Sequence, residues 1–280
     1  MTATTLYLSD LDGTLLASDG TLSTVTRTTM NRLIADEGLL FSYATARSYE
    51  SAQVVVAGLD VRMPVAVYGG ALIVDGRSGE VLTRHGLDRS LVSLVVAECR
   101  ARNLPPIVYE FCDGRDWVSW NQAEESAGTR NYTATRRGDR RMRPVDSWEQ
   151  LPANDVFYLT IIGEREVIEE AAESLAGQLA GHATLVVQRD NYYPDEYWLE
   201  ISAVEANKAV AATELQRHAG ADRLVCFGDN NNDLPMFGVA DASFAMANAN
   251  ESVRAAASAV VTANDDDAVV RQIALLHGAR

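Results

Sequence analysis

The chain has 280 residues, of which 47% are hydrophobic and 22% charged, so it can bury one large core or two smaller ones and is not of the disordered class. Its net charge of −15 opposes long-range attraction to nucleic acid or anionic membranes, and no apolar stretch approaches the roughly 20 residues that span a bilayer. The amino terminus shows no signal-peptide pattern, so we expect a two-domain cytoplasmic protein that binds neither nucleic acid nor membrane, and leave its oligomeric state open.

The amino-terminal part alternates between strand-like and helix-like patterns. Residues 6–9 form an apolar run typical of a short buried strand. Ser23 is a suitable N-cap for a helix over 25–37, and Gly38 favours the end of that helix. The pattern further predicts a strand at 39–45, a helix at 49–57, and two strands around a Gly-Gly break within 64–75.

The carboxyl-terminal part repeats this rhythm. Predicted helices cover 208–218 and 234–237 and start at 251 and 266; predicted strands cover 223–229, 243–248 and 259–262. Both ends therefore look like parts of one α/β domain with a doubly wound, Rossmann-like parallel sheet. The middle of the chain differs from both ends in composition and pattern. It is rich in Trp and Arg and has strand-like runs at 156–163 and 183–188. We predict a core domain from 1–81 and 196–280, with an α/β module inserted at 82–195.

Ligands of an open parallel sheet bind at the carboxyl ends of its strands, so polar residues at those ends are the first candidates for a site. Four places stand out: Asp10 with Asp12, Thr45–Ser48, Lys208, and Gly228–Asp233. If the first and last strands of this set are neighbours, four carboxylates face one another, those of Asp10, Asp12, Asp229 and Asp233. A cluster of this kind needs a cation.

All-oxygen ligands without nearby His or Cys favour a hard ion, and a site that keeps waters and a substrate phosphate favours Mg²⁺ over Ca²⁺. The three cysteines and four histidines are scattered, which fits neither a disulfide framework nor a zinc site. Taken singly, the Asp10 and Asp12 pair could be a solvated turn, and Gly228–Asp233 an Asn-rich loop with Asx turns. Their joint occurrence after two apolar strands favours the metal site.

A cation at the start of a helix opposes the helix dipole, and Lys208 stands at such a position after the probable N-cap Asn207. An anion opposite would offset that misfit, although an exposed lysine that bends into water is the alternative. Thr45 offers a hydroxyl to the same anion, and the helix start after it offers backbone N–H groups. Arg47 fits a phosphate contact and a surface salt bridge equally well.

At this point the sequence resembles the haloacid dehalogenase superfamily. The segments "DLDGTLL" from Asp10, "TARS" from Thr45, Lys208 and "GDNNND" from Gly228 are similar to its four ordered motifs. The later "FAMANA" and "VVTANDDDAVVRQI" are similar to the tail of its Cof-type phosphatases, which belong to subclass IIB. That family carries an α/β cap domain between its second and third motifs, which matches the change in composition at 82–195.

The resemblance implies a Mg²⁺-dependent phosphatase that acts on a small phosphorylated metabolite, such as a sugar phosphate, through an aspartyl phosphate. Asp10 would be the nucleophile, and Asp12 the acid and base for the leaving alcohol and the attacking water. The expected metal ligands are Asp10, the backbone carbonyl of Asp12, Asp229 and, in or just behind the coordination shell, Asp233. The expected phosphate-binding residues are Thr45, Arg47, Lys208 and Asn232, the last in support of that network.

Departures from the family pattern leave the substrate open. Ala46 and Ala209 stand where relatives usually have Gly, and Gly69 where they often have Asn, which removes a polar side chain near the substrate. A phosphomutase that returns the phosphoryl group to its substrate is one alternative function. A non-catalytic phosphate-binding module is another, which the complete set of Asp10, Asp12, Lys208 and Asp229 disfavours.

Two further segments of the middle region have open roles. The run "RRGDRRMR" at 136–143 could guide an anionic substrate, but a solvated basic loop is favoured. The stretch "YYPDEYW" at 192–198 could stack on a sugar, but two strand edges that pack around a turn are favoured.

Overall fold

The computed structural model describes residues 3–151, 155–190 and 193–278, which form two compact units. The first unit comprises Met1–Arg84 and Glu205–Arg280, and the second comprises His85–Val204. The chain thus leaves the first unit after residue 84 and returns to it at 205, against predicted boundaries at 81 and 195. Among the described residues, no helix is long and apolar enough to cross a membrane.

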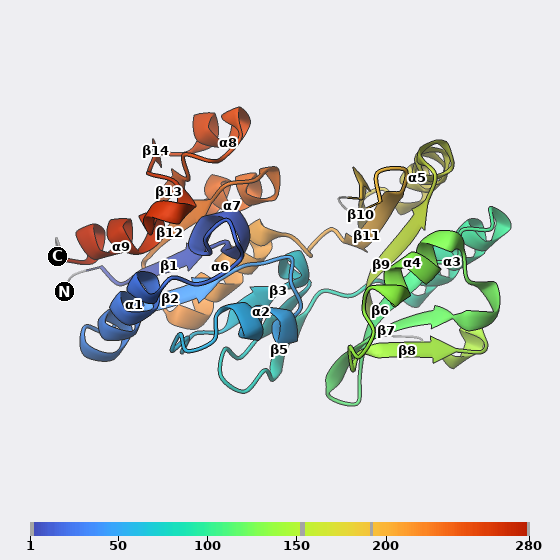
Figure 1. The fold of residues 1–280 in the computed structure, drawn as a ribbon, viewed down its shortest axis with the longest axis horizontal. Coiled ribbons are helices and arrows are strands. Elements are labelled where there is room, and N and C mark those ends of the chain that lie inside the picture. Colours follow the sequence, from blue (N-terminus) through green and yellow to red (C-terminus); the bar gives the residue numbers. More distant parts are fainter. Residues whose placement is uncertain (1–2, 152–154, 191–192, 279–280) are drawn as a thin grey trace. The chain divides into compact units, whose positions relative to one another are not determined.

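The first unit is built on a parallel sheet, as the sequence predicts, and its five strands follow the order β14-β13-β12-β1-β2 (Figure 1). These strands are β1 Thr5–Ser9, β2 Leu40–Tyr43, β12 Arg223–Gly228, β13 Ala242–Ala245 and β14 Ala259–Val260. The helices are α1 Thr24–Asp36, α2 Tyr49–Val55, α6 Lys208–Ala219, α7 Leu234–Val239, α8 Glu251–Ala256 and α9 Ala268–Gly278. Thus α9 starts two residues later than predicted, after a short turn at Asn264–Asp266.

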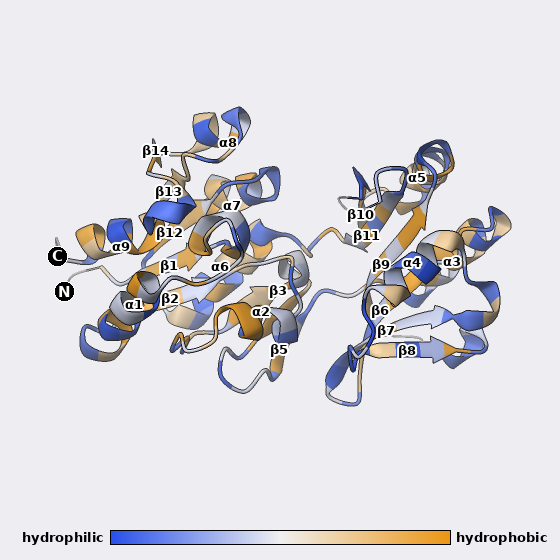
Figure 2. Ribbon diagram, in the orientation of Figure 1, coloured by the Kyte–Doolittle hydropathy of each residue, from blue (hydrophilic) through white to orange (hydrophobic). Residues whose placement is uncertain are grey.

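Helices cover both faces of this sheet, which is what makes it doubly wound. Leu6 and Leu8 of β1 are buried in one cluster with Ala211 and Leu215 of α6. Tyr7, which alternates with them along the strand, meets the ring of His277 in α9 edge-on. Helix α9 also packs against α1 (Figure 1). Because both faces are covered, β1 and β12 are apolar along most of their length (Figure 2).

A small antiparallel sheet extends the first unit. Its strands are β3 Val65–Val67, β4 Leu72–Val74 and β5 Val81–Arg84. The Gly-Gly break separates β3 from β4 as predicted, and Gly69 and Gly70 both have positive φ, at 65° and 104°. At Gly70 a Cβ atom would lie 2.6 Å from the carbonyl oxygen of Asn207, so the absence of a side chain lets this turn approach the start of α6.

The second unit is a six-stranded sheet in the order β10-β11-β9-β6-β7-β8, antiparallel except for the β7–β8 pair. Its strands are β6 Ile107–Cys112, β7 Arg115–Asn121, β8 Met142–Val145, β9 Val156–Gly163, β10 Ala183–Arg189 and β11 Tyr197–Ala203. Its helices are α3 Arg89–Ala101, α4 Ala127–Ala134 and α5 Arg165–Leu179, and all three contact β9. The predicted strands at 156–163 and 183–188 are confirmed as β9 and β10.

The Arg-rich run 136–143 is largely engaged in contacts within this unit. Arg141 pairs with Asp116 and Asp139, and Arg143 pairs with the fully buried Glu110. Only part of the run is a solvated basic surface, because these guanidinium groups hold the edge of the sheet together.

The core of the first unit gives a direct stability test. Leu8→Ala removes a side chain with no exposed surface between β1 and α6, so we expect a loss of about 2–5 kcal/mol in the free energy of unfolding, measured by urea denaturation. Leu275→Ala makes the same change at a side chain in α9 that is 68% exposed, and we expect less than about 0.5 kcal/mol. Equal losses at the two positions would contradict this account of the core.

Candidate active site

The site lies where β1 and β12 end side by side. The two strands pair in parallel with Ser9 opposite Phe227, and the Asp10 amide donates to the Phe227 carbonyl oxygen at 3.0 Å. This register carries Asp10 and Asp229 to the same edge of the sheet, each immediately after the last residue of its strand. The rule that ligands bind at carboxyl ends of parallel strands therefore applies to this pair.

Lys208 is held between two carboxylates. Its Nζ lies 2.7 Å from Oδ1 of Asp10 and 2.6 Å from Oδ1 of Asp233. The lysine side chain is 2% exposed, which excludes the alternative of a lysine that bends into water. The Asn207 side chain caps α6 by accepting from the amides of Ala209 and Val210, so the helix start that presents Lys208 is fixed.

Asp233 is fully buried and holds both Lys208 and the loop after β12 in place. Its Oδ2 accepts from the backbone amides of Asp229 and Asn230 at 2.9 and 3.0 Å, while Oδ1 faces Lys208. Gly228 precedes this loop, and a Cβ there would come within 2.6 Å of the Asp233 side chain. Both carboxylate oxygens of Asp233 are thus occupied by protein donors, and the loop is a closed structure rather than a solvated run of asparagines.

Asp229 is fixed by a residue that the sequence analysis did not single out. Thr14 donates its hydroxyl to Oδ1 of Asp229 at 2.6 Å. Thr14 lies in the tight turn Leu11–Leu15, where Gly13 has a φ of 75° and a Cβ on Gly13 would lie 2.4 Å from Oδ2 of Asp229. The position of the Thr14 hydroxyl, directly after Asp12 and Gly13, was the only signal in the sequence for this role. The sequence could not indicate its partner, because Asp229 lies 215 residues away.

Three of the predicted carboxylates meet. Oxygen atoms of Asp10, Asp229 and Asp233 all lie within 4.8 Å of one another, in a group that could hold a metal ion. Burial, and then the nearby charge of Asp233, raise the pKa of Asp10 to about 7 although Lys208 opposes the shift. Burial likewise raises the pKa of Asp229. The group thus holds three carboxylates and one lysine, which contacts two of them, and the excess negative charge fits a cation with oxygen ligands.

The carboxylates around Lys208 favour its charged form. Burial lowers its pKa, but the carboxylates of Asp10 and Asp233 outweigh burial, and the pKa is raised above its usual value. Lys208 is also the only lysine in the chain, which has 24 basic residues in all. The compact ammonium group reaches both carboxylates from one position.

The Asp12 side chain is separate from this cluster and is paired with Arg47. Arg47 donates from Nη2 and Nε to the two carboxylate oxygens of Asp12, at 2.5 and 2.8 Å. Hydrogen bonding to Asp12 raises the pKa of the Arg47 guanidinium. Of the two interpretations that the sequence left open for Arg47, the structure shows the salt bridge, and it is made to the residue expected to transfer protons.

The remaining predicted residues differ in how they are held. Thr45 is fully buried at the end of β2, its amide donates to the Ala66 carbonyl, and its hydroxyl accepts from the Arg47 amide at 3.2 Å. Asn232 is exposed in the short turn Asn231–Asp233, and its side chain makes no hydrogen bond to the described residues. The structure therefore brings Asp10, Lys208, Asp229 and Asp233 together. It shows no hydrogen bond from the Asn232 side chain to this group.

Comparison with known proteins decides the family. Residues 7–273 match the model of the haloacid dehalogenase-like hydrolases. The chain belongs to this family. The resemblance carried by the four motifs is therefore confirmed.

Several relatives and solved structures are similar over nearly their whole length. A 5-amino-6-(5-phospho-D-ribitylamino)uracil phosphatase, YitU of Bacillus subtilis, is 27% identical over 271 residues, which cover 95% of each chain. An HMP-PP phosphatase of an Enterobacter species is 26% identical over 86% of this chain and 83% of its own. A solved structure from Eubacterium rectale is 23% identical with a TM-score of 0.80, covering 97% of this hydrolase and 98% of that chain.

The lysine bridge gives a pH-dependent test. Lys208→Met leaves two buried carboxylates without a counter-charge, so we expect this hydrolase to lose about 3–5 kcal/mol of unfolding free energy at pH 8. The loss should shrink at pH 5, because without the lysine the pKa of Asp10 rises further, and protonation at low pH then removes the unpaired charge.

Urea denaturation of the variant at both pH values measures the effect. Arg223→Met, at an exposed position that begins β12, is the matched control and should change little at either pH. A loss for Lys208→Met that is as large at pH 5 as at pH 8 would contradict the proposed charge balance.

Proposed function

We propose that this hydrolase is a Mg²⁺-dependent phosphatase that cleaves small phosphomonoesters through a phosphorylated Asp10. The observation that carries the proposal is the position of Lys208 Nζ, 2.7 Å from Oδ1 of Asp10 in a group of three carboxylates, two of them buried and one half-buried, at the ends of β1 and β12. Such a site offers a nucleophile, a fixed positive charge and ligands for a cation in one place, which phosphoryl transfer requires.

Asp10 is the proposed nucleophile. One of its carboxylate oxygens forms a bond to phosphorus while the bond from phosphorus to the ester oxygen breaks. Lys208 keeps the attacking carboxylate in place and, because it stays charged, stabilises the negative charge on the transferring phosphoryl group. Asp233 acts through Lys208 and the loop amides rather than on the substrate.

Asp12 is the proposed acid and base. It gives a proton to the ester oxygen as that bond breaks, and then takes a proton from the water whose oxygen attacks phosphorus and releases Asp10. The bidentate pair with Arg47 occupies both carboxylate oxygens of Asp12, so the pair must loosen before the first proton transfer. The phosphate group of a substrate is an anion that competes for Arg47, which reconciles the salt bridge with the predicted phosphate contact.

The proposed phosphate ligands add to this arrangement. The Thr45 hydroxyl lies at the end of β2, next in the sheet to β1, and Asn232 is exposed on the loop after β12. Both therefore stand at the edge of the sheet that carries Asp10. A hydroxyl and an amide can donate hydrogen bonds to phosphoryl oxygens without adding charge.

The residues present fit a magnesium ion. Asp10, Asp229 and the backbone carbonyl of Asp12 are the proposed ligands, all of them oxygen donors of the kind Mg²⁺ prefers. Asp233, whose two oxygens are taken by Lys208 and backbone amides, stands behind them. When bound, Mg²⁺ supplies positive charge to the reacting phosphate and favours the ionised form of Asp10.

The substrate class rests on the relatives. By their names, the Bacillus subtilis relative acts on a phosphorylated ribitylaminouracil and the Enterobacter relative on HMP-PP, and both are phosphatases. We infer a small phosphorylated metabolite as the substrate of this hydrolase. A phosphomutase would share the first transfer to Asp10 but return the phosphoryl group to the substrate instead of to water.

Asp10→Asn tests the nucleophile. We expect phosphate release from a panel of phosphorylated metabolites to fall by about a thousandfold or more, because the amide cannot form the phosphoryl intermediate. Asp36→Asn makes the same change on the exposed face of α1 and should keep the wild-type rate. Turnover that survives Asp10→Asn or metal chelation would overturn the proposal, and an isomerised phosphate ester with little free phosphate would indicate the mutase.

Metal binding should depend on pH in a defined direction. With the pKa of Asp10 raised to about 7 by burial, the residue is protonated below that pH and must lose its proton to a bound cation. The apparent Mg²⁺ affinity should therefore fall about tenfold per pH unit below pH 7 and level off above it. Isothermal titration calorimetry between pH 5.5 and 8.5 measures this, and an affinity that is constant from pH 5.5 to 7 would contradict it.

A further inference from the structure

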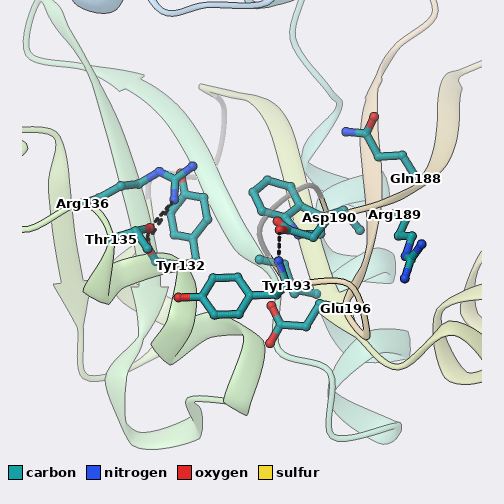
Figure 3. Close-up of a pocket in the computed structure, with 10 residues that line it drawn as sticks. Tyr132, Thr135, Arg136, Gln188, Arg189, Asp190, Tyr193 and Glu196 are labelled. Atoms are coloured by element: carbon teal, nitrogen blue, oxygen red, sulfur yellow. Dashed lines mark hydrogen bonds between the residues drawn. The ribbon is translucent and has the colours of Figure 1, made fainter.

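The second unit holds a cavity of about 580 Å³ between α4 and the hairpin of β10 and β11, which we call the α4 pocket (Figure 3). It is defined here by Tyr132, Arg136, Gln188, Asp190, Glu196 and Trp198. A volume of this size is typical of sites for small organic ligands. The pocket includes side chains of the Arg-rich run and of the aromatic stretch, the two segments whose roles the sequence left open.

One wall of the α4 pocket is an aromatic corner that is held rigidly. Tyr132 is 5% exposed, and its hydroxyl shares a hydrogen bond of 2.7 Å with that of Tyr109 in β6. The Trp198 ring lies 5.7 Å from the Tyr132 ring, at an interplanar angle of 58°. Ile162 and Trp198 are paired residues of β9 and β11, so both stand on the same face of the sheet and line the pocket together. The corner is therefore anchored on both the helix and the sheet.

A guanidinium group completes this corner. The Cζ atom of Arg136 lies 3.6 Å from the centre of the Tyr132 ring and 6.0 Å from that of Trp198. Its Nη1 donates to the Tyr132 carbonyl and to the Thr135 hydroxyl, at 3.1 and 2.9 Å (Figure 3). Arg136 is only half-buried, so it presents a planar, weakly hydrated surface to the cavity at a fixed position.

The opposite wall carries hydrogen-bonding groups in set positions. Oε1 of Glu196 accepts from Nδ2 of Asn131 at 2.6 Å. Oδ1 of Asp190 accepts from the Tyr193 amide at 2.7 Å, as Figure 3 shows. Gln188 adds an amide, which can both donate and accept. The indole N–H of Trp198 is buried and has no acceptor among the described residues. The pocket thus offers both acceptors and donors around flat surfaces.

The charges in its lining distinguish the α4 pocket from a phosphate-binding site. Arg136 and Arg189 balance Asp190 and Glu196 within the lining, in a chain whose net charge is −15. The two carboxylates offset the two guanidinium groups, so the lining gives a phosphate no net attraction, and an uncharged ligand does not need one. A flat ring can stack on the aromatic and guanidinium surfaces, while its ring N–H and carbonyl groups match the acidic and amide side chains.

We propose that the α4 pocket binds a planar, uncharged nitrogen heterocycle with ring N–H and carbonyl groups. This binding requires neither Asp10 nor a metal ion, so it extends beyond the proposed phosphatase reaction. The ring has two possible sources, the non-phosphate part of a substrate or a separate compound. Both share the same recognition chemistry, and a kinetic comparison distinguishes them.

Binding of 5-fluorouridine to the full-length protein, followed by ¹⁹F NMR, tests the proposal. Saturable binding is expected, and ribose, which lacks the heterocycle, should not displace the probe. Arg136→Ala should weaken binding at least about tenfold, because it removes the guanidinium surface. Arg137→Ala, the same change at the exposed neighbouring residue, should leave the affinity unchanged.

A second pair of variants keeps side-chain size. Glu196→Gln replaces a carboxylate acceptor by an amide and should weaken binding of 5-fluorouridine several-fold, while Asp195→Asn, at the adjacent exposed position, should not. Thermal unfolding of all four variants shows whether the second unit stays folded. Unchanged binding in both pocket variants contradicts the proposal, and so does displacement of the probe by ribose.

A kinetic comparison of two phosphate esters shows whether the ring belongs to the substrate or to a separate compound. The ratio of kcat/KM for uridine 5′-phosphate over ribose 5-phosphate should fall in Arg136→Ala if the ring belongs to the substrate. The ratio should stay that of the wild type if a separate compound binds, and in both cases the NMR probe loses affinity. Asp10→Asn should retain probe binding, so failure of the phosphatase proposal and failure of this one give different results. No binding of 5-fluorouridine at millimolar concentration by the wild-type protein would overturn the proposal.

Discussion

The ammonium group of Lys208 between Asp10 and Asp233 is the contact on which the rest of the site depends. Three carboxylates converge at the ends of β1 and β12, and burial makes their charges costly. The lysine offsets part of that cost and fixes one oxygen of Asp10. Burial, with a smaller part from Asp233, still raises the pKa of Asp10, and the excess of negative charge leaves a place where a divalent cation fits.

The surrounding backbone is shaped to allow this convergence. Gly13 and Gly228 stand where a side chain would collide with Asp229 and Asp233, so the two loops can close on one another. Thr14 and the amides after Gly228 then hold the two aspartates from opposite loops. Asp12, the proposed acid and base, pairs with Arg47 outside this closed group, so Asp10 and Asp12 lie in different environments that fit their different proposed roles.

The sequence predicts most of the first unit because its patterns are local. Apolar runs, the Ser23 cap and the glycine breaks mark β1, α1 and the β3–β4 turn, and the strand-end rule brings the aspartates together. The sequence did not predict contacts between distant segments. The contacts of Thr14 with Asp229 and of Arg47 with Asp12 depend on strand register and loop shape. In the second unit, the buried Glu110 and the arginines of the 136–143 run break the simple pattern, because ion pairs across strands stabilise charges that composition assigns to the surface.

The most direct test of the account is chemical trapping of the Asp10 intermediate. Enzyme quenched during turnover of a phosphate ester is reduced with borohydride, which converts an acyl phosphate to an alcohol, and the peptide that contains residue 10 is analysed by mass spectrometry. The account predicts homoserine at position 10, only in the presence of substrate and Mg²⁺ and never in Asp10→Asn. Reduction at another carboxylate, or none during confirmed turnover, would contradict it.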